Sequence, residues 1–397
     1  MAPEHLRRVL GQNPDLPQGR TGAEGGTRWF SWSDVAALRQ HFAVVSARSA
    51  GWGKAYVPRR PTGARAPLIA LTGPQGQSGR STALLHLACA AALAGYRVLV
   101  LDADPAGQLA PQLGAQWGAT QPPAPPATSL LPLIALSCGV HLRGVNASRL
   151  DRGEAPVPMD EVIAAALDGA ATDATALIRP TAWPGLDVIA ASPDLLLADM
   201  QIAGWCRSLR SWHPARALAA ALDRAGLRSR YDLILCDTGR GLGPLVLAVL
   251  SSADVLLVPC RGGQVADGLA GLARAMALQE AEATMTARAL GQVPPRAGWR
   301  RIVGLQIGPA QATATQATAT QSLPPLPALL PAPLPIVPQI TAGQAAHLYA
   351  LDYRAVGRLA YGPLRDGCDA AWRGLAGVLT GLWAEDAAAV SESDRAG

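Results

Sequence analysis

LIALTGPQGQSGRSTALLHLACAAALAGYRVLVLDADP, residues 68–105, is the stretch that decides the fold of this 397-residue chain. Its apolar run LIALT (68–72) predicts a buried strand, and a glycine-rich turn separates that strand from a helix expected over 81–94. Gly95 ends the helix, and RVLVLD (97–102) predicts the next strand. A strand, a helix and a second strand in this order predict a parallel sheet with helices packed on its faces.

Further apolar runs continue this alternation of strands and helices. They are LDVIAA (186–191), DLILCD (232–237), ADVLLVPC (253–260), RIVGLQI (301–307) and LPIVPQI (334–340). Continuous apolar runs, without polar residues at every second position, are typical of strands that helices cover on both faces. The predicted fold class is therefore α/β, with a doubly wound and mostly parallel sheet.

Polar residues follow three of the predicted strands at their carboxyl ends. The glycine-rich turn 73–82 follows the first strand, Asp102 and Asp104 follow the second, and Asp237 ends the strand at 232–237. In open α/β sheets ligands bind beyond the carboxyl ends of the strands, so we expect these groups to lie together. A glycine-rich turn at a helix N-terminus offers N–H groups to phosphate, and hydroxyl and carboxylate oxygens suit Mg²⁺. The sequence therefore predicts a site for a nucleoside triphosphate and its metal ion.

Two segments carry a more specific signal. APLIALTGPQGQSGRSTALLHLACAAALAGYRVLVLDADPAGQLAPQLG (66–114) resembles the opening of the ParA-type partition ATPases, including the RepA-like partition proteins of repABC plasmids. YDLILCDTGRGLGPLVLAVLSSADVLLVP (231–259) resembles their Walker B segment, and weaker similarity runs from about residue 26 to 385. The resemblance implies a P-loop NTPase fold of the ParA/MinD type, with ATP or ADP and Mg²⁺ as cofactors.

The resemblance also implies roles for individual residues. Asp104 matches the acid that positions the attacking water, Ser81 matches the magnesium hydroxyl, and Asp237 matches the Walker B acid. Asp102 stands where the family has a further carboxylate on the magnesium side. Arg80 occupies the place of the general phosphate lysine and is the second catalytic candidate. Nucleotide contacts are expected along the whole deviant Walker A loop: Gln75, Gly76, Gln77, Ser78, Gly79, Arg80, Ser81 and Thr82.

The loop departs from the family pattern at several positions. Gln75 replaces the signature lysine that reaches the partner's nucleotide in the sandwich dimer, and Gln77 replaces a glycine. Arg80 keeps the charge of lysine but is longer and planar, so the exchange is not conservative. Losing a charge aimed at phosphoryl transfer costs on the order of 10³-fold in rate, and we therefore expect weak or lost ATP hydrolysis. Gly239 and Arg240 replace prolines after the Walker B acid; Arg240 either supplies charge to the phosphates or is a solvated loop arginine.

The chain divides into three predicted parts. Residues 1–66 form a basic extension, whose net charge of 10 − 4 = +6 exceeds the +5 of the whole chain. One helix is expected in it, in FSWSDVAALRQHFAVV (30–45), with Ser31 or Ser33 as its cap; it is either a remnant of a DNA-binding region or a dimerisation or packing helix. Residues 67–385 form the ParA-like domain, with a low-complexity loop at about 309–333, and 386–397 are expected to be a disordered tail.

Two functional hypotheses follow. The first is a plasmid or chromosome partition protein, a nucleotide-dependent homodimer that contacts DNA and a ParB-like partner. The second is a pseudo-ATPase that acts as an interaction or regulatory subunit. A basic extension attracts DNA, although a solvated tail has the same composition, and further DNA contacts are expected at Arg354, Arg358 and Arg365.

The remaining composition narrows the class and location. The six cysteines form no CxxC pair, which disfavours the cluster-bearing nitrogenase-type reductases. No apolar run approaches the ~20 residues that span a bilayer, and no signal peptide is recognised. We therefore expect a cytoplasmic protein, with association to the nucleoid as a possibility for a DNA-binding one.

Overall fold

The structure is a computed structural model that describes most of the chain. The described residues are 3–21, 28–47, 53–73, 79–115, 129–168, 174–215, 217–239, 241–261, 265–289, 301–307, 328–330, 334 and 358–396. Among them, no helix combines the length and the apolar character needed to cross a membrane.

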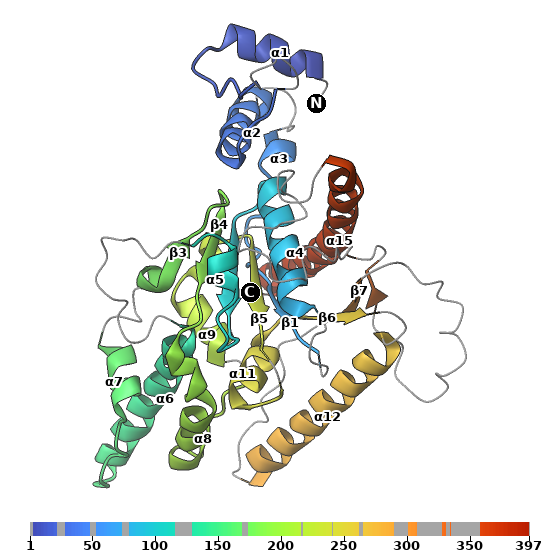
Figure 1. Ribbon diagram of the computed structural model, residues 1–397. Helices are drawn as coiled ribbons and strands as arrows, with labels where there is room; N and C mark the ends of the chain where they lie inside the picture. The colour runs from blue at the N-terminus through green and yellow to red at the C-terminus, as the bar shows by residue number, and fades with distance from the viewer. Residues whose placement is uncertain are drawn as a thin grey trace.

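An eight-stranded sheet forms the centre of the molecule, in the order β3-β4-β2-β5-β1-β6-β7-β8 (Figure 1). All neighbouring strands run parallel except β3 and β4 at one edge, which are antiparallel. The strands are β1 (Leu68–Leu71), β2 (Val98–Asp102), β3 (Ile178–Pro180), β4 (Leu186–Ile189), β5 (Leu233–Asp237), β6 (Val255–Arg261), β7 (Arg301–Ile307) and β8 (Ala328–Leu329). The mostly parallel sheet confirms the predicted α/β class.

Helices cover both faces of this sheet. They are α4 (Arg80–Ala94), α5 (Leu109–Gln112), α6 (Leu131–Asp151), α7 (Glu161–Leu167), α8 (Ala198–Ser208), α9 (Ala217–Arg224), α10 (Leu227–Arg230), α11 (Pro244–Ser252), α12 (Val265–Ala289) and α15 (Arg358–Ala396), with short 3-10 turns at Ala174–Leu177 and Pro193–Leu196. Alternate residues of one strand point to opposite faces. In β1, Leu68 and Ala70 pack with α6, α9 and α11, whereas Ile69 and Leu71 pack with α4 and α15. The strands are therefore buried on both faces, which explains why they are continuous apolar runs.

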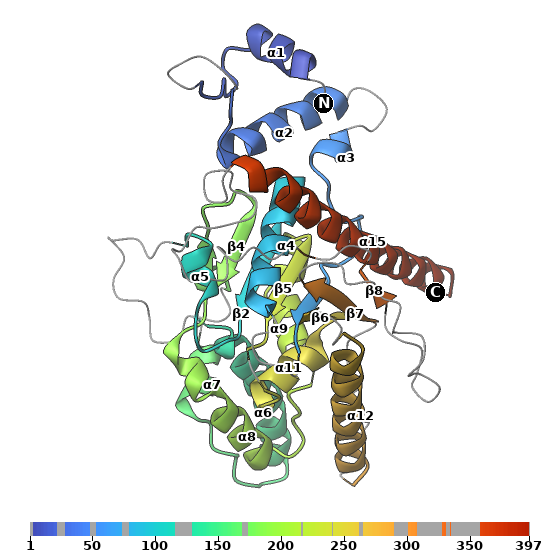
Figure 2. The ribbon, with the colours of Figure 1, turned by 45° about the vertical axis from the view of Figure 1, so that its right-hand side comes forward.

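Three helices precede the sheet, where one was expected: α1 (Pro3–Gln12), α2 (Trp32–Ala47) and α3 (Gly53–Tyr56). They stand together at one end of the molecule, and α6, α7 and α8 lie at the opposite end (Figure 2). Ser31 caps α2 as predicted, since its hydroxyl accepts a hydrogen bond from the Asp34 amide while the Asp34 carboxylate accepts one from the Ser31 amide. Leu10, Leu38 and Phe42 form a small apolar core of their own.

The segment after α3 ties this N-terminal region to the sheet. The Arg39 guanidinium donates to the carbonyls of Tyr56 and Ala94, and Arg59 donates to the carbonyl of Gly95. These arginines satisfy carbonyls at the C-terminal end of α4, where cations also complement the helix dipole. Gly95 itself has φ 103°, and a Cβ there would lie 2.9 Å from the Tyr56 carbonyl oxygen. Only glycine fits this crossing of the two segments.

Two segments of the structure differ from the prediction, and two predicted segments lie mostly outside the described residues. α6, which begins at Leu131, is a helix that the sequence did not predict. The expected tail at 386–397 is not a separate segment, since α15 continues to Ala396. The low-complexity loop at about 309–333 and the strand at 334–340 are described only at β8, residue 330 and Leu334, which forms one parallel bridge to Ile307.

Candidate functional site

The sheet brings the three polar strand ends to one edge. β2, β5 and β1 are consecutive neighbours, and Asp237 is in register with Asp102 on one side and with Leu71 on the other. Thr238 joins the two strand ends further, because its hydroxyl donates to the Leu71 carbonyl at 3.0 Å. The expectation that these segments meet is confirmed by the pairing of their strands.

α4 begins at this edge and presents its N-terminus there. Gly79 precedes its first turn with φ 80°, a left-handed conformation that glycine adopts without strain. No side chain among the described residues caps this end, so the first amides of a 15-residue helix remain available to an anion. Of the predicted nucleotide loop, 79–82 are described, whereas Gln75, Gly76, Gln77 and Ser78 lie outside the described residues.

Ser81 and Asp237 form the central pair of the site. The Ser81 hydroxyl donates to Asp237 Oδ2 at 2.5 Å. The other carboxylate oxygen, Oδ1, is buried and has no hydrogen-bond partner among the described residues. Burial raises the pKa of Asp237, although the hydrogen bond from Ser81 and the charge of Arg80 offset part of this rise. A buried carboxylate with one unused oxygen is a site that a cation would complete.

Arg80 lies beside this pair. Its side chain is buried, and its Nη1 is 3.5 Å from the carbonyl oxygen of Gly73, at the start of the loop. The guanidinium therefore stays within the loop instead of extending into solvent. Its charge acts on Asp237 and offsets part of the rise in the pKa of that carboxyl; the role of Arg80 toward phosphate stays a prediction.

Asp102 uses both carboxylate oxygens to hold the backbone that follows β2. Its Oδ1 accepts from the amide of Asp104 at 3.1 Å and its Oδ2 accepts from the amide of Leu109 at 3.3 Å. Burial, followed by the nearby charge of Asp237, raises the pKa of Asp102 to about 7. Asp102 thus lies where a carboxylate was predicted, and its hydrogen bonds shape the loop that carries Asp104.

Asp104 is half-buried and faces the loop after β5. Its Oδ1 accepts from the amide of Ala106 at 3.0 Å. Across from it, Gly239 has φ 68°, and a Cβ at Gly239 would lie 3.2 Å from the Cα of Asp104. Proline has its φ fixed near −65°, so it cannot adopt this conformation. The left-handed conformation of Gly239 thus excludes a proline at this position; Arg240, the next residue, lies outside the described part.

Asp199 lies next to the site, and no pattern in the sequence pointed to it. It lies on α8, and its Oδ1 accepts from the amide of Leu245 at 2.8 Å, in the first turn of α11. It therefore caps the helix that follows the 238–243 loop. The contact joins residues 46 positions apart, and no local pattern announces such a cap.

The residues present fit a magnesium ion of the P-loop kind. Mg²⁺ in such sites is held by one hydroxyl, one or two carboxylates, waters and phosphate oxygens, not by a cage of protein ligands. Ser81 and the unused oxygen of Asp237 supply that type of donor set. Within the described part of the chain, no group of three or more His, Cys, Asp or Glu residues could hold a metal ion alone. Metal binding here would thus depend on a phosphate ligand.

The chain is similar in sequence to a known protein family and to individual known proteins. The sequence profile of the AAA domain family matches residues 66–285, more than half of the chain. A protein named putative replication protein A from Sinorhizobium fredii is 27% identical over 250 residues, 62% of this chain and 51% of that protein. The chromosome-partitioning ATPase Soj of Thermus thermophilus is 29% identical over 205 residues, 51% of this chain and 59% of that protein.

A solved structure is similar at lower identity. The ATP complex of McdA from Cyanothece has a TM-score of 0.49 and 17% identity, covering 79% of this chain and 97% of that one. The chain spans about half the length of the two curated relatives named above.

Proposed function

The chain belongs to the AAA domain family, as a ParA-type partition ATPase related to RepA-like replication proteins, and from this premise we propose that it is a partition or replicon-maintenance protein that binds ATP or ADP with Mg²⁺. One observation carries the proposal: the hydroxyl of Ser81 and the carboxylate of Asp237 meet at the uncapped N-terminus of α4. The helix amides would bind the phosphates, and Ser81 with Asp237 would hold the metal. Bound there, Mg²⁺ would neutralise phosphate charge.

Weak or lost hydrolysis is the second part of the proposal. Asp104 is placed beside the 238–243 loop, where it could orient a water, and Asp102 holds its backbone. The cations of the loop, however, are reduced to Arg80, since Gln75 carries no charge. The bulky guanidinium lies buried beside Gly73, which supports retained binding more than efficient transfer.

Dimerisation and contacts with DNA and a ParB-like protein complete the proposal. One structural observation bears on the DNA contacts that were expected at the C-terminal arginines. Arg365 is 3.3 Å from Asp366 and 3.9 Å from Asp369, so its charge is compensated locally. The side chains of Arg354 and Arg358 are not among those described. The N-terminal helices carry the exposed cations Arg7, Arg8 and Lys54, which we propose as DNA contacts.

A ligand-induced shift in thermal stability tests the nucleotide site. A ligand at 100 times its Kd raises the free energy of unfolding by about 2.7 kcal/mol, which is readily measured as a rise in Tm. We expect this rise with Mg-ATP, and we expect Ser81→Ala to weaken Mg-ATP binding by about tenfold or more, because a hydrogen bond to a charged group is lost. Thr380→Ala, which removes an exposed hydroxyl on α15, is the matched control. A wild-type protein that millimolar Mg-ATP does not stabilise would contradict the proposal.

Restoring the lysines tests the loss of hydrolysis. The double change Gln75→Lys with Arg80→Lys should raise the rate of ATP turnover, because a charge of the arginine-finger kind is worth on the order of 10³-fold in rate. Release of inorganic phosphate is the measurement. Efficient turnover by the wild-type chain would refute this part of the proposal, and bound nucleotide without any rise would favour the regulatory subunit, with Gln77 or Gly239 as the remaining obstacle.

A further inference from the structure

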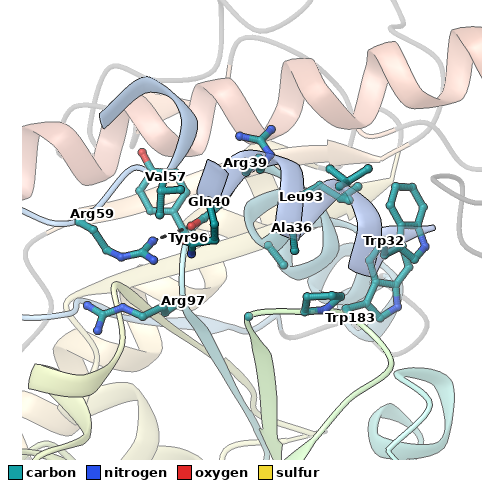
Figure 3. Close-up of a pocket in the computed structure, with 15 residues that line it drawn as sticks. Trp32, Ala36, Arg39, Gln40, Val57, Arg59, Leu93, Tyr96, Arg97 and Trp183 are labelled. Carbon is teal, nitrogen blue, oxygen red and sulfur yellow. Dashed lines mark hydrogen bonds between the residues drawn. The ribbon is translucent and has the colours of Figure 1, made fainter. Parts of the chain in front are cut away.

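A second cavity lies at the other end of α4, away from the phosphate loop. It has a volume of about 210 Å³ and is lined by α2, the C-terminal end of α4, the start of β2 and residues 183–185 (Figure 3). Because α4 has 15 residues, at 1.5 Å per residue the two ends lie roughly 22 Å apart. The cavity is therefore separate from the site of the proposed function, and the inference drawn from it does not depend on that function.

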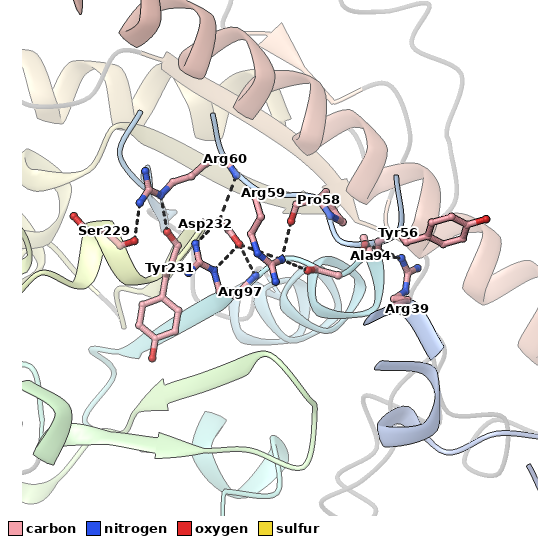
Figure 4. A network of polar contacts seen from close by, with 11 residues as sticks. Arg39, Tyr56, Pro58, Arg59, Arg60, Ala94, Arg97, Ser229, Tyr231 and Asp232 are labelled. Carbon is pink, nitrogen blue, oxygen red and sulfur yellow. Dashed lines mark hydrogen bonds and ion pairs between the residues drawn. The ribbon is translucent and has the colours of Figure 1, made fainter. Parts of the chain in front are cut away.

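The cavity carries an excess of positive charge. Three arginines line it, Arg39, Arg59 and Arg97, and one carboxylate, Asp232, contacts two of them among the described residues (Figure 4). Asp232 is fully buried and is bound to Arg97 through two side-chain nitrogens, at 2.8 and 3.1 Å, while Arg59 Nη1 is 3.7 Å away. Arg39 contacts carbonyl groups, and burial lowers the pKa of its guanidinium. Arg59 and Arg97 thus share one carboxylate, and Arg39 has no counter-ion in the described part of the chain.

Arg39 and Arg59 also have guanidinium nitrogens that make no hydrogen bond to the described residues. Every hydrogen bond of Arg39 and Arg59 to described residues runs through Nη1, so Nε and Nη2 of both side chains are uncommitted to them. Nη1 of each guanidinium caps the C-terminal end of α4, and the other two nitrogens remain available to a ligand. A planar fork of donors matches the oxygens of a phosphate group.

The opposite end of the cavity is aromatic. Trp32 stacks on Trp183, with ring centroids 4.8 Å apart and an interplanar angle of 23°. Trp183 is buried, whereas Trp32 on α2 is only half-buried and lines the cavity. Figure 3 shows the two tryptophans at one end and Arg59 with Arg97 at the other. The cavity therefore offers an aromatic surface and a cationic surface to a single ligand.

We propose that this cavity is a second ligand site, which binds the phosphate and the aromatic base of one nucleotide. The phosphate is bound by the arginines, and the base stacks against Trp32, since aromatic stacking and charge-assisted hydrogen bonds are the two interactions on offer. A free mononucleotide and an unpaired nucleotide of a strand share this chemistry. A ligand here contacts α2 and the end of α4 together and so joins the N-terminal helices to the ATPase fold.

Charge changes at Gln40 test the site without removing any contact. Gln40 lines the cavity, is exposed and makes no hydrogen bond to the described residues. Binding of AMP to the full chain, in EDTA so that no Mg²⁺ is present, is measured by calorimetry. Gln40→Glu should weaken AMP binding by about fivefold and Gln40→Arg should strengthen it by about fivefold, as expected for one unit charge near a phosphate in a partly exposed site.

Gln12→Glu and Gln12→Arg are the controls, because they place the same charges on α1, outside the cavity. Adenosine and inorganic phosphate should each bind more weakly than AMP. A short single-stranded oligonucleotide that binds more tightly than AMP, with the same response to Gln40, would identify a strand as the source of the nucleotide. Absence of AMP binding at millimolar concentration, equal binding by both Gln40 variants, or inorganic phosphate binding as well as AMP would each overturn the proposal.

Discussion

Asp237 shows how much of a site can depend on the two oxygens of one side chain. Oδ2 accepts the hydrogen bond from Ser81, whereas Oδ1 is buried without a partner among the described residues. Leaving a buried acceptor unsatisfied costs roughly 1–3 kcal/mol, more for a charged group, and the amide of Gly239 offsets part of this cost for Asp237. A cation that contacts Oδ1 would remove the cost, which couples ligand binding to the stability of the fold.

His86 provides a prediction at the same scale. It lies within α4, is fully buried, and neither ring nitrogen has a partner among the described residues. Burial lowers its pKa to about 4, from an ordinary value of 6.5. Between these values the unfolded chain binds a proton that the folded protein does not, so the free energy of unfolding should fall as pH falls from about 6.5 to about 4. The loss should be on the order of 3 kcal/mol, since each pKa unit is about 1.4 kcal/mol.

Replacement of His86 isolates this effect from the titration of the carboxylates. His86→Leu places an apolar side chain in the same space, and leucine cannot be protonated. Urea denaturation of both proteins at several pH values between 4 and 7.5 is the measurement. The stability difference between wild type and variant should change with pH over that range, and a constant difference would show that His86 is not the group responsible.

The residues of the site were predictable to different degrees. The sequence predicted site roles for Ser81, Asp102, Asp104 and Asp237 from the ends of the apolar strands, the glycine-rich turn and the family resemblance. The pairing of β2, β5 and β1 brings these segments together, while the roles themselves stay predictions. Asp199 was not found, since its role arises only when α8 packs against the start of α11. The left-handed conformation of Gly239 was likewise invisible, because a departure from the family pattern does not reveal the backbone path that replaces it.

At the scale of elements, the central strands were predicted well and the helices less evenly. The apolar runs of β1, β2, β5 and β6 are unambiguous, because burial on both faces leaves no charged residue in them before their last position. α6 was missed for the opposite reason: its N-terminal half is buried on nearly all sides, so it has no apolar stripe, and its first turn contains a proline. The end of α15 resembles a solvated tail in sequence because its acidic and small residues lack an apolar face, although alanine and glutamate favour helix.

One buried ion pair joins three elements of the sheet, and its loss should be costly. Arg228 of α10 is 2.9 Å from Asp254, and their side chains are only 2% and 3% exposed. Asp254 also accepts from the amide of Leu68, the first residue of β1. Arg228→Met would leave a buried carboxylate without its main counter-ion, which typically costs about 3–5 kcal/mol.

Denaturant unfolding measures this loss directly. The free energy of unfolding of Arg228→Met should fall by that amount relative to wild type. Arg224→Ala, on the exposed side of neighbouring α9, is the matched control and should change stability by less than about 0.5 kcal/mol. Equal stability of the two variants would show that the ion pair between Arg228 and Asp254 does not contribute to the free energy of unfolding.

At the scale of the whole molecule, the basic charge of the N-terminal helices predicts salt-dependent DNA binding. Neutralising Arg7, Arg8 and Lys54, all of them exposed, should lower the affinity for DNA of any sequence. Each phosphate contact removed should reduce the slope of log K against log salt by about 0.9. Fluorescence anisotropy with duplex DNA over a series of salt concentrations gives that slope.

The control for this experiment removes the same charge elsewhere. Arg207, Arg210 and Arg224 are exposed on or near α8 and α9, far along the chain from the N-terminal helices. Changing these three to glutamine should leave the slope as it is in wild type. An equal loss of slope in both triple variants would mean that DNA is attracted by net charge alone, without a defined surface.

The close contact of Gly95 with the Tyr56 carbonyl limits which segments can be exchanged between this protein and a relative. The N-terminal helices look like a separable module, yet they meet the remainder of the chain through a glycine that tolerates no side chain and through Asp232, which binds Arg97 and the backbone of Arg60. A chimaera that exchanged residues 1–66 with those of a relative would keep its junction only if residues 94–97 and 231–232 were exchanged as well. Three segments scattered along the gene are therefore expected to be inherited together, and natural exchange of this module between relatives should leave matched changes in all three.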